Sequence, residues 1–316
     1  MRIPRMVAVR LAAAVPTVFL ASAIVFFLQR LIPGDPAVTE AGQDATPQAI
    51  AHIRVLLGLN HPIPVQYWDW LTGIVHANLG TSIQSSQPTL TVIGDHLPAS
   101  VIIWVGSLIV SVGAGIPLGI RAARSRHRPA DEVITSVASV GIAMPSFWLG
   151  MLLVFLFSLK LHWFPATGSV PFSQSPLQSI RAAVLPSVAL GCVGAAEVAR
   201  QVRSAMIEVL TQDYIRTDLA KGLRSSSVIW LHALKNAGLP IATIVGLLIG
   251  RIISGSVVVE SVFGVPGVGS LLIQAVNARD YPVVQGVVLV LVIVVLLINF
   301  LIDLFYRVID PRLREA

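Results

Sequence analysis

Few residues of this chain have the types and spacing of a catalytic site. Its three lysines are Lys160, Lys221 and Lys235, and none follows a glycine, which excludes a Gly-Lys-Ser/Thr phosphate loop. The seven histidines form no HExxH pair and no Cys/His set with zinc spacing, and no Gly-x-Ser-x-Gly elbow is present. We therefore predict no catalytic residue, no metal ligand and no cofactor bound by this chain.

A glycine-rich segment is the nearest match to a phosphate cradle. It consists of Gly264, Gly267 and Gly269 around Pro266. A phosphate site needs the N-terminus of a helix behind such a loop, and no charged helix opens here. We favour a turn at the mouth of an apolar helix.

The composition is that of a membrane protein. Of 316 residues, 55% are hydrophobic and 12% charged, with a mean hydropathy of +0.80. The apolar residues form long runs, which a bilayer requires and a soluble core does not. The net charge of +6 indicates orientation in the membrane, not nucleic-acid binding, because no basic stripe is interleaved with aromatics. Cys192 is the single cysteine and cannot form an internal disulfide.

Six apolar runs predict six transmembrane helices. They cover residues 11–28, 99–120, 133–159, 183–205, 239–263 and 283–306. The first is too long for the apolar core of a signal peptide, so a retained anchor is expected. The second is rich in glycine and serine, which favours close packing inside a bundle. The third contains Pro145, which should kink it.

The charges predict the orientation of these helices. Basic residues gather on one side, at Arg2, Arg5, Arg10, the loop 121–128, the stretch 200–235 and the tail with Arg307, Arg312 and Arg314. The other side holds an acidic first loop, residues 32–97. The positive-inside rule makes the basic side cytosolic, with both termini there. Within the first loop, Tyr67, Trp68 and Trp70 predict an amphipathic helix at the headgroup level.

The stretch between the fourth and fifth runs, residues 206–238, reads as short amphipathic helices. Its apolar residues are Tyr214, Ile215, Leu219, Leu223, Val228, Ile229, Leu231 and Leu234. Gly222 should break the helix and turn the chain, and Ser225, Ser226 and Ser227 offer N-cap hydroxyls for the next one. Pro240 suits the first turn of the fifth run. Composition alone leaves two readings equal: a surface that a soluble motor grips, and a plain connecting loop.

The sequence of this stretch resembles a known motif. Residues 212–223 (QDYIRTDLAKGL) and 230–240 (WLHALKNAGLP) are similar to the coupling motif of binding-protein-dependent ABC importer permeases. Further similarity to the dipeptide, oligopeptide and nickel permease group lies at residues 31–36, 145–150, 163–168, 259–269, 279–286 and 310–312. The long first loop is similar to that of the first permease of the pair in such systems.

This resemblance implies a function and partners. The partners would be a second homologous permease, two cytosolic ABC ATPase subunits that hold ATP and magnesium, and an extracytoplasmic substrate-binding protein, in a prokaryotic plasma membrane. Peptides would be the cargo; nickel chelates, glutathione or another small solute are alternatives within the family, and a stand-alone channel or membrane-bound enzyme is the alternative outside it. The ATPase contact would be Arg216, Asp218, Ala220, Lys221, Gly222, Leu223 and Arg224. Asp218 and Leu219 depart from the small or basic residues usual there.

Three charged residues inside apolar runs are candidates for the translocation path. Glu197 and Arg251 stand where related permeases carry apolar or small residues, at depths near the membrane midplane. An unpaired charge there costs about 3 kcal/mol or more, so we predict an ion pair or a shared polar lining. Pairing with the partner permease is the alternative. Glu260 belongs to the family pattern near the outer end of the fifth run, where a gate and a structural hydrogen bond are equally plausible.

We therefore expect an all-α membrane protein with a type I ABC importer permease fold. Residues 1–31 would form the N-terminal tail and first helix, and 32–97 an extracytoplasmic insertion. Residues 98–306 would form a five-helix core that includes the cytosolic segment 206–238, and 307–316 a cytosolic tail.

Overall fold

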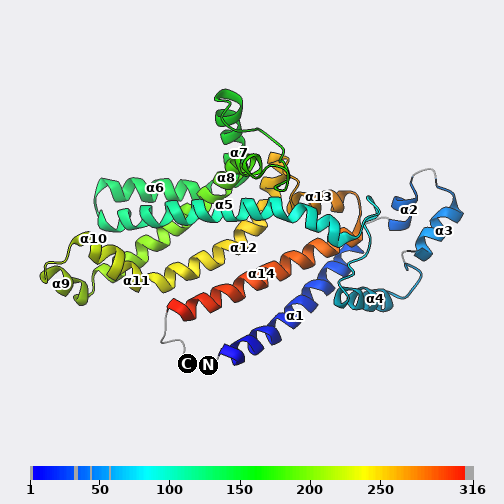
Figure 1. Ribbon diagram of the computed structural model, residues 1–316, viewed down its shortest axis with the longest axis horizontal. Coiled ribbons are helices and arrows are strands. Elements are labelled where there is room, and N and C mark those ends of the chain that lie inside the picture. Colours follow the sequence, from blue (N-terminus) through cyan, green and yellow to red (C-terminus); the bar gives the residue numbers. More distant parts are fainter. Residues whose placement is uncertain (1–2, 32–34, 43–44, 57, 310–316) are drawn as a thin grey trace. The chain divides into compact units, whose positions relative to one another are not determined.

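The computed structural model describes residues 3–31, 35–42, 45–56 and 58–309, and these are helical almost throughout (Figure 1). In the first half of the chain the helices are α1 (Ile3–Gln29), α2 (Pro36–Ala41), α3 (Pro47–Leu56), α4 (Ile63–Val75), α5 (Thr89–Arg124), α6 (Pro129–Ala143), α7 (Ser146–Leu153) and the π-helix η1 (Val154–Lys160). In the second half they are α8 (Pro176–Leu210), α9 (Asp213–Ala220), α10 (Ser225–Ser227), the π-helix η2 (Val228–Ala233), α11 (Leu234–Asn236), α12 (Gly238–Phe263), α13 (Val268–Asn277) and α14 (Tyr281–Ile309).

The predicted all-α class is confirmed. Within the described ranges the β structure amounts to an isolated bridge between Thr81 and Pro88. The predictions for Arg2 and for the tail with Arg312 and Arg314 lie outside the described residues, as does part of the motif at 31–36.

Five of the described helices are long and apolar enough to cross a bilayer. They are Ala12–Gln29, Thr89–Arg124, Pro176–Leu210, Gly238–Phe263 and Tyr281–Ile302, and they correspond to five of the six predicted runs. The remaining run is the pair Pro129–Ala143 and Ser146–Lys160, which passes the same test only as a broken span. The count of six therefore depends on this pair and stays a prediction.

The break in that pair is sharper than the predicted kink. The two helices meet at an angle of 102°. Met144, which precedes Pro145, has extended backbone angles (φ −84°, ψ 126°). A proline ring clashes with a helical residue before it and removes one amide donor, so the helix ends at Ala143 and restarts after Pro145. The position of the bend was predicted correctly, and its size was underestimated.

Two other boundaries differ from the predictions. α5 begins at Thr89, ten residues before the predicted apolar run starts at Ala99; Ile93 is 2% exposed, and its burial outweighs the polar Asp95 and His96 beside it. The stretch between the fifth and sixth predicted runs, expected to form a turn and loop, contains α13. The Gly267 amide donates to Ser270 Oγ at 3.0 Å, which starts this helix directly after Pro266.

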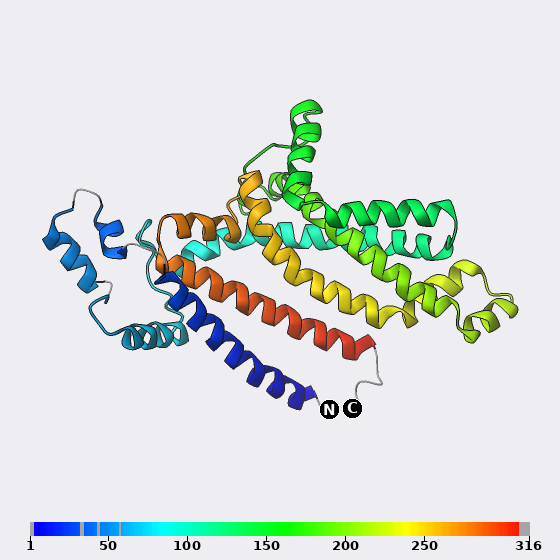
Figure 2. The same ribbon diagram turned by 180° about the vertical axis from the view of Figure 1, so that it is seen from behind.

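The chain divides into two compact units, each described here by itself. The first contains residues 101–265 and the end of α14 from 297. In it α8 packs against α6, α7 and α12, and both ribbon views show α8 beside α12 (Figures 1 and 2). A Cβ atom added at Gly119 of α5 would lie 2.6 Å from the Ala199 carbonyl oxygen of α8. The predicted close packing of the second run is thus confirmed.

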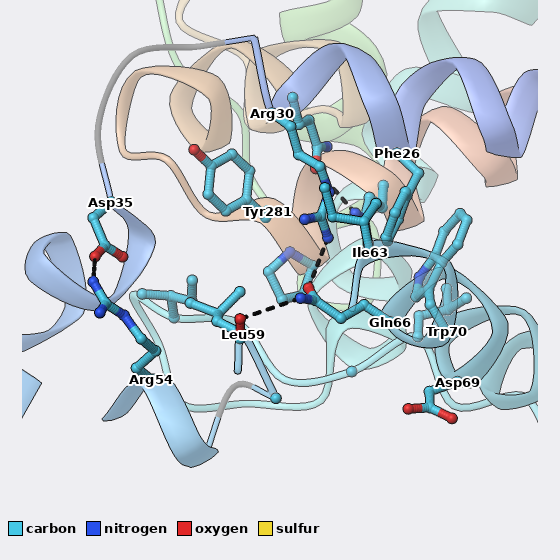
Figure 3. A pocket seen from close by; sticks show the side chains of 17 residues that line it. Phe26, Arg30, Asp35, Arg54, Leu59, Ile63, Gln66, Asp69, Trp70 and Tyr281 are labelled. Atoms are coloured by element: carbon cyan, nitrogen blue, oxygen red, sulfur yellow. Dashed lines mark hydrogen bonds and ion pairs between the residues drawn. The ribbon is translucent and has the colours of Figure 1, made fainter. Parts of the chain in front are cut away.

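The second unit contains residues 3–100 and 266–296. Its apolar core joins α1, the start of α5, α13 and α14 through Val25, Ile93, Val268 and Val287. Tyr67 and Trp70 of α4 stack near Phe26 of α1, whereas Trp68 is 65% exposed. Only Trp68 is thus free to lie in a headgroup region; the other two aromatics hold α4 against α1. A cavity of about 620 Å³ opens between the end of α1, α4 and the start of α14 (Figure 3).

Candidate functional site

The predicted coupling segment, residues 206–238, folds as a compact excursion between α8 and α12. α9, α10, η2 and α11 follow one another within it and lie together at one end of α8 and α12 (Figure 2). α9 packs against η2, and η2 contacts α8. The segment is thus attached to the helix bundle of its own unit and is not a plain extended connection.

Gly222 turns the chain between α9 and α10. Its φ of +80° lies in the left-handed region, where a side chain is strained. The Gly222 amide donates to the Leu219 carbonyl at 3.0 Å and the Leu223 amide to the Asp218 carbonyl at 3.3 Å. These two bonds form a Schellman motif, which confirms the predicted helix break.

One face of the coupling segment is buried and the other is exposed. Ile215, Val228 and Ile229 are 2–4% exposed and anchor α9 and η2. Leu219 and Leu223, flanking the turn, are 49% and 41% exposed. Exposed residues at the turn also include Arg216, Ala220, Lys221, Gly222 and Arg224. An apolar ridge beside basic side chains, held on a buried anchor, has the character of a docking surface.

Asp218 differs from the other predicted contact residues. Its side chain is 19% exposed, and its Oδ2 lies 2.5 Å from Nδ1 of His232 on η2. The carboxylate thus ties α9 to η2, which gives Asp218 a role inside the segment. Its predicted contact with an ATPase stays a prediction.

The predicted N-cap role of Ser225, Ser226 and Ser227 is wrong. These serines form α10 itself, and Arg224 is the N-cap residue without a side-chain cap bond. The extended backbone of Arg224 (φ −60°, ψ 132°) starts the helix one residue earlier than the serine hydroxyls suggested. Pro240 lies in the first turn of α12, as predicted.

Glu197 and Arg251 meet between α8 and α12. Arg251 Nη1 donates to Glu197 Oε1, so the predicted ion pair is present. The Glu197 side chain is 13% exposed and that of Arg251 51%. Glu197 Oε2 is buried without a hydrogen-bond partner among the described residues. The pair therefore leaves part of the Arg251 side chain exposed, whereas the second carboxylate oxygen of Glu197 is inaccessible.

Glu260 lies in α12, three residues before its last residue, and its side chain is fully buried. A residue at 0% exposure faces protein, not an open path. The burial favours the structural role over the gate among the two alternatives left by the sequence.

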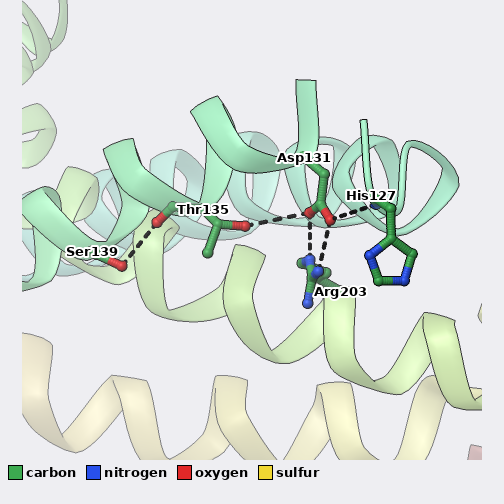
Figure 4. A network of polar contacts seen from close by, with 5 residues as sticks. All are labelled: His127, Asp131, Thr135, Ser139 and Arg203. Carbon is green, nitrogen blue, oxygen red and sulfur yellow. Dashed lines mark hydrogen bonds and ion pairs between the residues drawn. The ribbon is translucent and has the colours of Figure 1, made fainter. Parts of the chain in front are cut away.

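A second ion pair was not predicted. Arg203 of α8 donates to Asp131 of α6 through Nε at 2.6 Å and Nη2 at 2.7 Å (Figure 4). The His127 amide and the Thr135 hydroxyl also donate to the Asp131 carboxylate, both at 3.4 Å. Asp131 is 5% exposed, so its charge is compensated by a bidentate guanidinium and two further donors. The pair fixes the start of α6 to α8, the helix that leads into the coupling segment.

Comparisons with known proteins agree with this geometry. Residues 115–315 match the family described as "Binding-protein-dependent transport system inner membrane component", and residues 3–103 match the N-terminal family of the same membrane components. The chain belongs to this family. A Brucella abortus protein named, provisionally, as a peptide transport system permease is 42% identical over 305 residues, covering 96% of this chain and 97% of that protein.

Other relatives fit the same assignment. The Salmonella typhi "Glutathione transport system permease protein GsiC" is 39% identical over 305 residues, which cover 96% of this chain and 97% of the relative. Among solved structures, the inward-facing MetNI methionine ABC transporter aligns with a TM-score of 0.59 at 18% identity, over 70% of this chain and 97% of that one. This likeness shows the fold alone.

The permease family places this chain as a multi-pass protein of a bacterial inner membrane. Residues 115–315 contain both ion pairs and the whole coupling segment. The described residues contain no cluster of three or more histidine, cysteine or acidic side chains that could hold a metal ion. Asp131 could have been found in the sequence because it follows Pro129 in the first turn of a helix, where acids are favoured. Its partner Arg203 lies 72 residues away, and no local pattern joins them.

Proposed function

We propose that this permease is the pore-forming subunit of an ATP-driven importer for di- and oligopeptides. Two cytosolic ATPase subunits would bind ATP and magnesium and perform the hydrolysis, and this chain would contribute no catalytic residue. A second homologous permease would complete the path, and an extracytoplasmic binding protein would deliver the cargo.

The exposed turn at Gly222 is the observation that carries this proposal. Leu219, Leu223 and the basic residues beside them stand on a buried anchor at the end of α8 and α12. A soluble ATPase that holds this ridge moves both helices when it closes, because the anchor prevents the segment from swinging independently. Closure of two ATPases would then move the paired permeases between inward- and outward-facing states.

The ion pair of Glu197 and Arg251 supports a polar path. A peptide carries a carboxylate, and the half-exposed Arg251 side chain of this pair presents a positive charge between α8 and α12. Charged residues within a transmembrane bundle usually face the bundle interior or a water-filled cavity, and mark substrate pathways. We assign Glu197 and Arg251 to the path and Glu260 to its structural frame.

The choice of peptides rests on the relatives. Proteins 37–42% identical to this chain are named as peptide transport permeases, and one at 39% as a glutathione permease. Glutathione is itself a small peptide, so both names favour a short peptide cargo. Nickel chelates or another small solute remain the alternatives. Uptake assays with peptides of graded length would order these cargoes directly.

Alanine substitution at two matched glycines tests the coupling. Gly222 and Gly168 have φ values of +80° and +86°, and a Cβ atom at either would meet nothing within 4 Å. Alanine in the left-handed region costs about 1–2 kcal/mol, so both variants carry similar strain. In the reconstituted four-subunit complex with its binding protein, Gly222→Ala should lower cargo-stimulated ATP hydrolysis at least about fivefold, whereas Gly168→Ala should not.

Equal stimulation in both variants would contradict the assigned coupling turn. Co-purification separates the importer from a stand-alone channel. If the tagged chain, extracted from its native membrane, brings down no ATPase subunit, the importer proposal fails.

A further inference from the structure

The cavity of the second unit has no role in the proposed coupling to an ATPase. Its volume of about 620 Å³ is in the range of small-molecule pockets. Side chains from α1, α4 and the start of α14 line it, together with those of Asp35 and Arg54 (Figure 3). Phe26, Trp70 and Tyr281 give it aromatic walls. By the predicted topology it opens on the extracytoplasmic side.

Two residues that line this cavity carry buried donor groups. Gln29 is 5% exposed, and its Nε2 has no hydrogen-bond partner among the described residues. Trp70 Nε1 is likewise buried and unpartnered. Leaving a buried donor unsatisfied costs about 1–3 kcal/mol. Because neither nitrogen is accessible from the cavity, the charged groups of the lining determine which ligand it can take.

Arg30 adds a positive charge to the same wall. Its Nη2 donates to Gln66 Oε1 at 2.7 Å, and its guanidinium carbon lies 4.3 Å from the centre of the Phe26 ring. Burial lowers the pKa of Arg30, an effect that Tyr281 opposes, yet an arginine stays charged at neutral pH. Within the described ranges, no carboxylate forms an ion pair with Arg30.

The other charges of the lining differ in their pairing. Asp35 and Arg54 form an ion pair with each other. Burial by itself would raise the pKa of Asp35, but the hydrogen bond from Arg54 and the Ala37 amide hold it below its ordinary value. Asp69 is exposed at the cavity, and no ion pair of the described residues involves it. The cavity thus presents one cation, Arg30, and one anion, Asp69, without an ion-pair partner among the described residues.

We propose that this cavity binds a small zwitterion of the amino-acid or short-peptide class. Its carboxylate contacts Arg30, and its ammonium contacts Asp69. The aromatic walls take the apolar body of the ligand. The residues that line the cavity do not include Glu197 or Arg251, and the identification of the ligand with the cargo rests on the proposed peptide import.

Binding of three related probes to the purified full-length chain tests this site. The probes are trialanine, trialanine amide, which lacks the carboxylate, and N-acetyl-trialanine, which lacks the ammonium. Since charge-assisted hydrogen bonds contribute about 1.5–3 kcal/mol, trialanine should bind about tenfold more tightly than either derivative. The Arg30→Gln variant should bind trialanine and trialanine amide with nearly equal affinity. The Asp69→Asn variant should bind trialanine and N-acetyl-trialanine with nearly equal affinity.

Arg279→Gln is the matched control. Arg279 belongs to the same unit but does not line the cavity, so this variant should keep both preferences. Equal affinity of the unaltered chain for the three probes would overturn the proposal, whatever the variants show. Displacement of trialanine by equimolar inorganic phosphate, or by phosphatidylglycerol in nanodiscs, would overturn it in favour of a phosphate or lipid headgroup site. The assay needs no ATPase, so its failure leaves the coupling proposal standing, and the reverse also holds.

Discussion

Two ion pairs join neighbouring helices in the bundle of the first unit. Arg251 reaches Glu197 between α8 and α12, and Arg203 reaches Asp131 between α6 and α8. The side chains of Arg203 and Asp131 are 30% and 7% exposed, those of Arg251 and Glu197 are 51% and 13% exposed, and Asp131 also accepts from two further donors. We therefore propose a structural role for Asp131 and a path role for Glu197 with Arg251.

Reversal of the charges tests the pair in the path. Glu197→Arg and Arg251→Glu each place two like charges together, at a cost of about 3 kcal/mol or more in a bilayer. The double variant restores opposite charges and should recover most of the thermal stability and transport that either single variant loses. If the exchanged pair is no better tolerated than either single reversal, the two residues do not act as a pair.

Asp131 should contribute more to stability than its neighbour. Asp131→Asn removes the charge that Arg203 pairs with, and loss of a charged hydrogen-bond partner costs about 1.5–3 kcal/mol. The adjacent Glu132 is exposed, so Glu132→Gln is the control and should change stability by less than about 0.5 kcal/mol. Equal unfolding temperatures of the two variants in detergent would show that the bidentate pair is not stabilising.

At the scale of helices, α5 and α8 approach each other closely because α5 carries glycine at the contact. Gly119→Ala would place its Cβ atom 2.6 Å from the Ala199 carbonyl oxygen and should destabilise the purified chain by about 1–3 kcal/mol. At Gly113, in the same helix, a Cβ atom meets nothing within 4 Å. Gly113→Ala should therefore stabilise α5 by about 0.5–1 kcal/mol through helix propensity. If denaturation experiments show that Gly119→Ala stabilises the chain and Gly113→Ala destabilises it, the packing of α5 against α8 described above is wrong.

The apolar helices and the Gly222 turn were predictable because their signals are local. Long apolar runs specify the spans, and a glycine between two amphipathic stretches specifies a turn. The start of α5 was missed because Asp95 and His96 interrupt the apolar run, while Ile93 is buried by residues far away in sequence. α13 was hidden by the glycines before it, and the pairing of Asp131 with Arg203 depends on how α6 and α8 pack. Such long-range contacts leave no local pattern.

At the scale of the whole molecule, the charge bias predicts the orientation in the membrane. In a background without Cys192, single cysteines at Ser85 and Ser226 would report on the insertion and on the coupling segment; both serines are exposed. A membrane-impermeant maleimide should label Ser85→Cys in intact cells and Ser226→Cys only after permeabilisation. Labelling of Ser226→Cys in intact cells would contradict the predicted orientation and place the coupling segment outside the cell.

The central claim is that an ATPase subunit docks on the turn of the coupling segment. A photo-crosslinking amino acid at Leu223, which is 41% exposed, tests it in the native membrane, with Phe172, 46% exposed and outside the segment, as the control position. The account predicts that the probe at Leu223 captures a protein identified by mass spectrometry as an ABC ATPase, and that the probe at Phe172 does not. Capture of no ATPase from Leu223, in cells where the assembled transporter is present, would contradict the account.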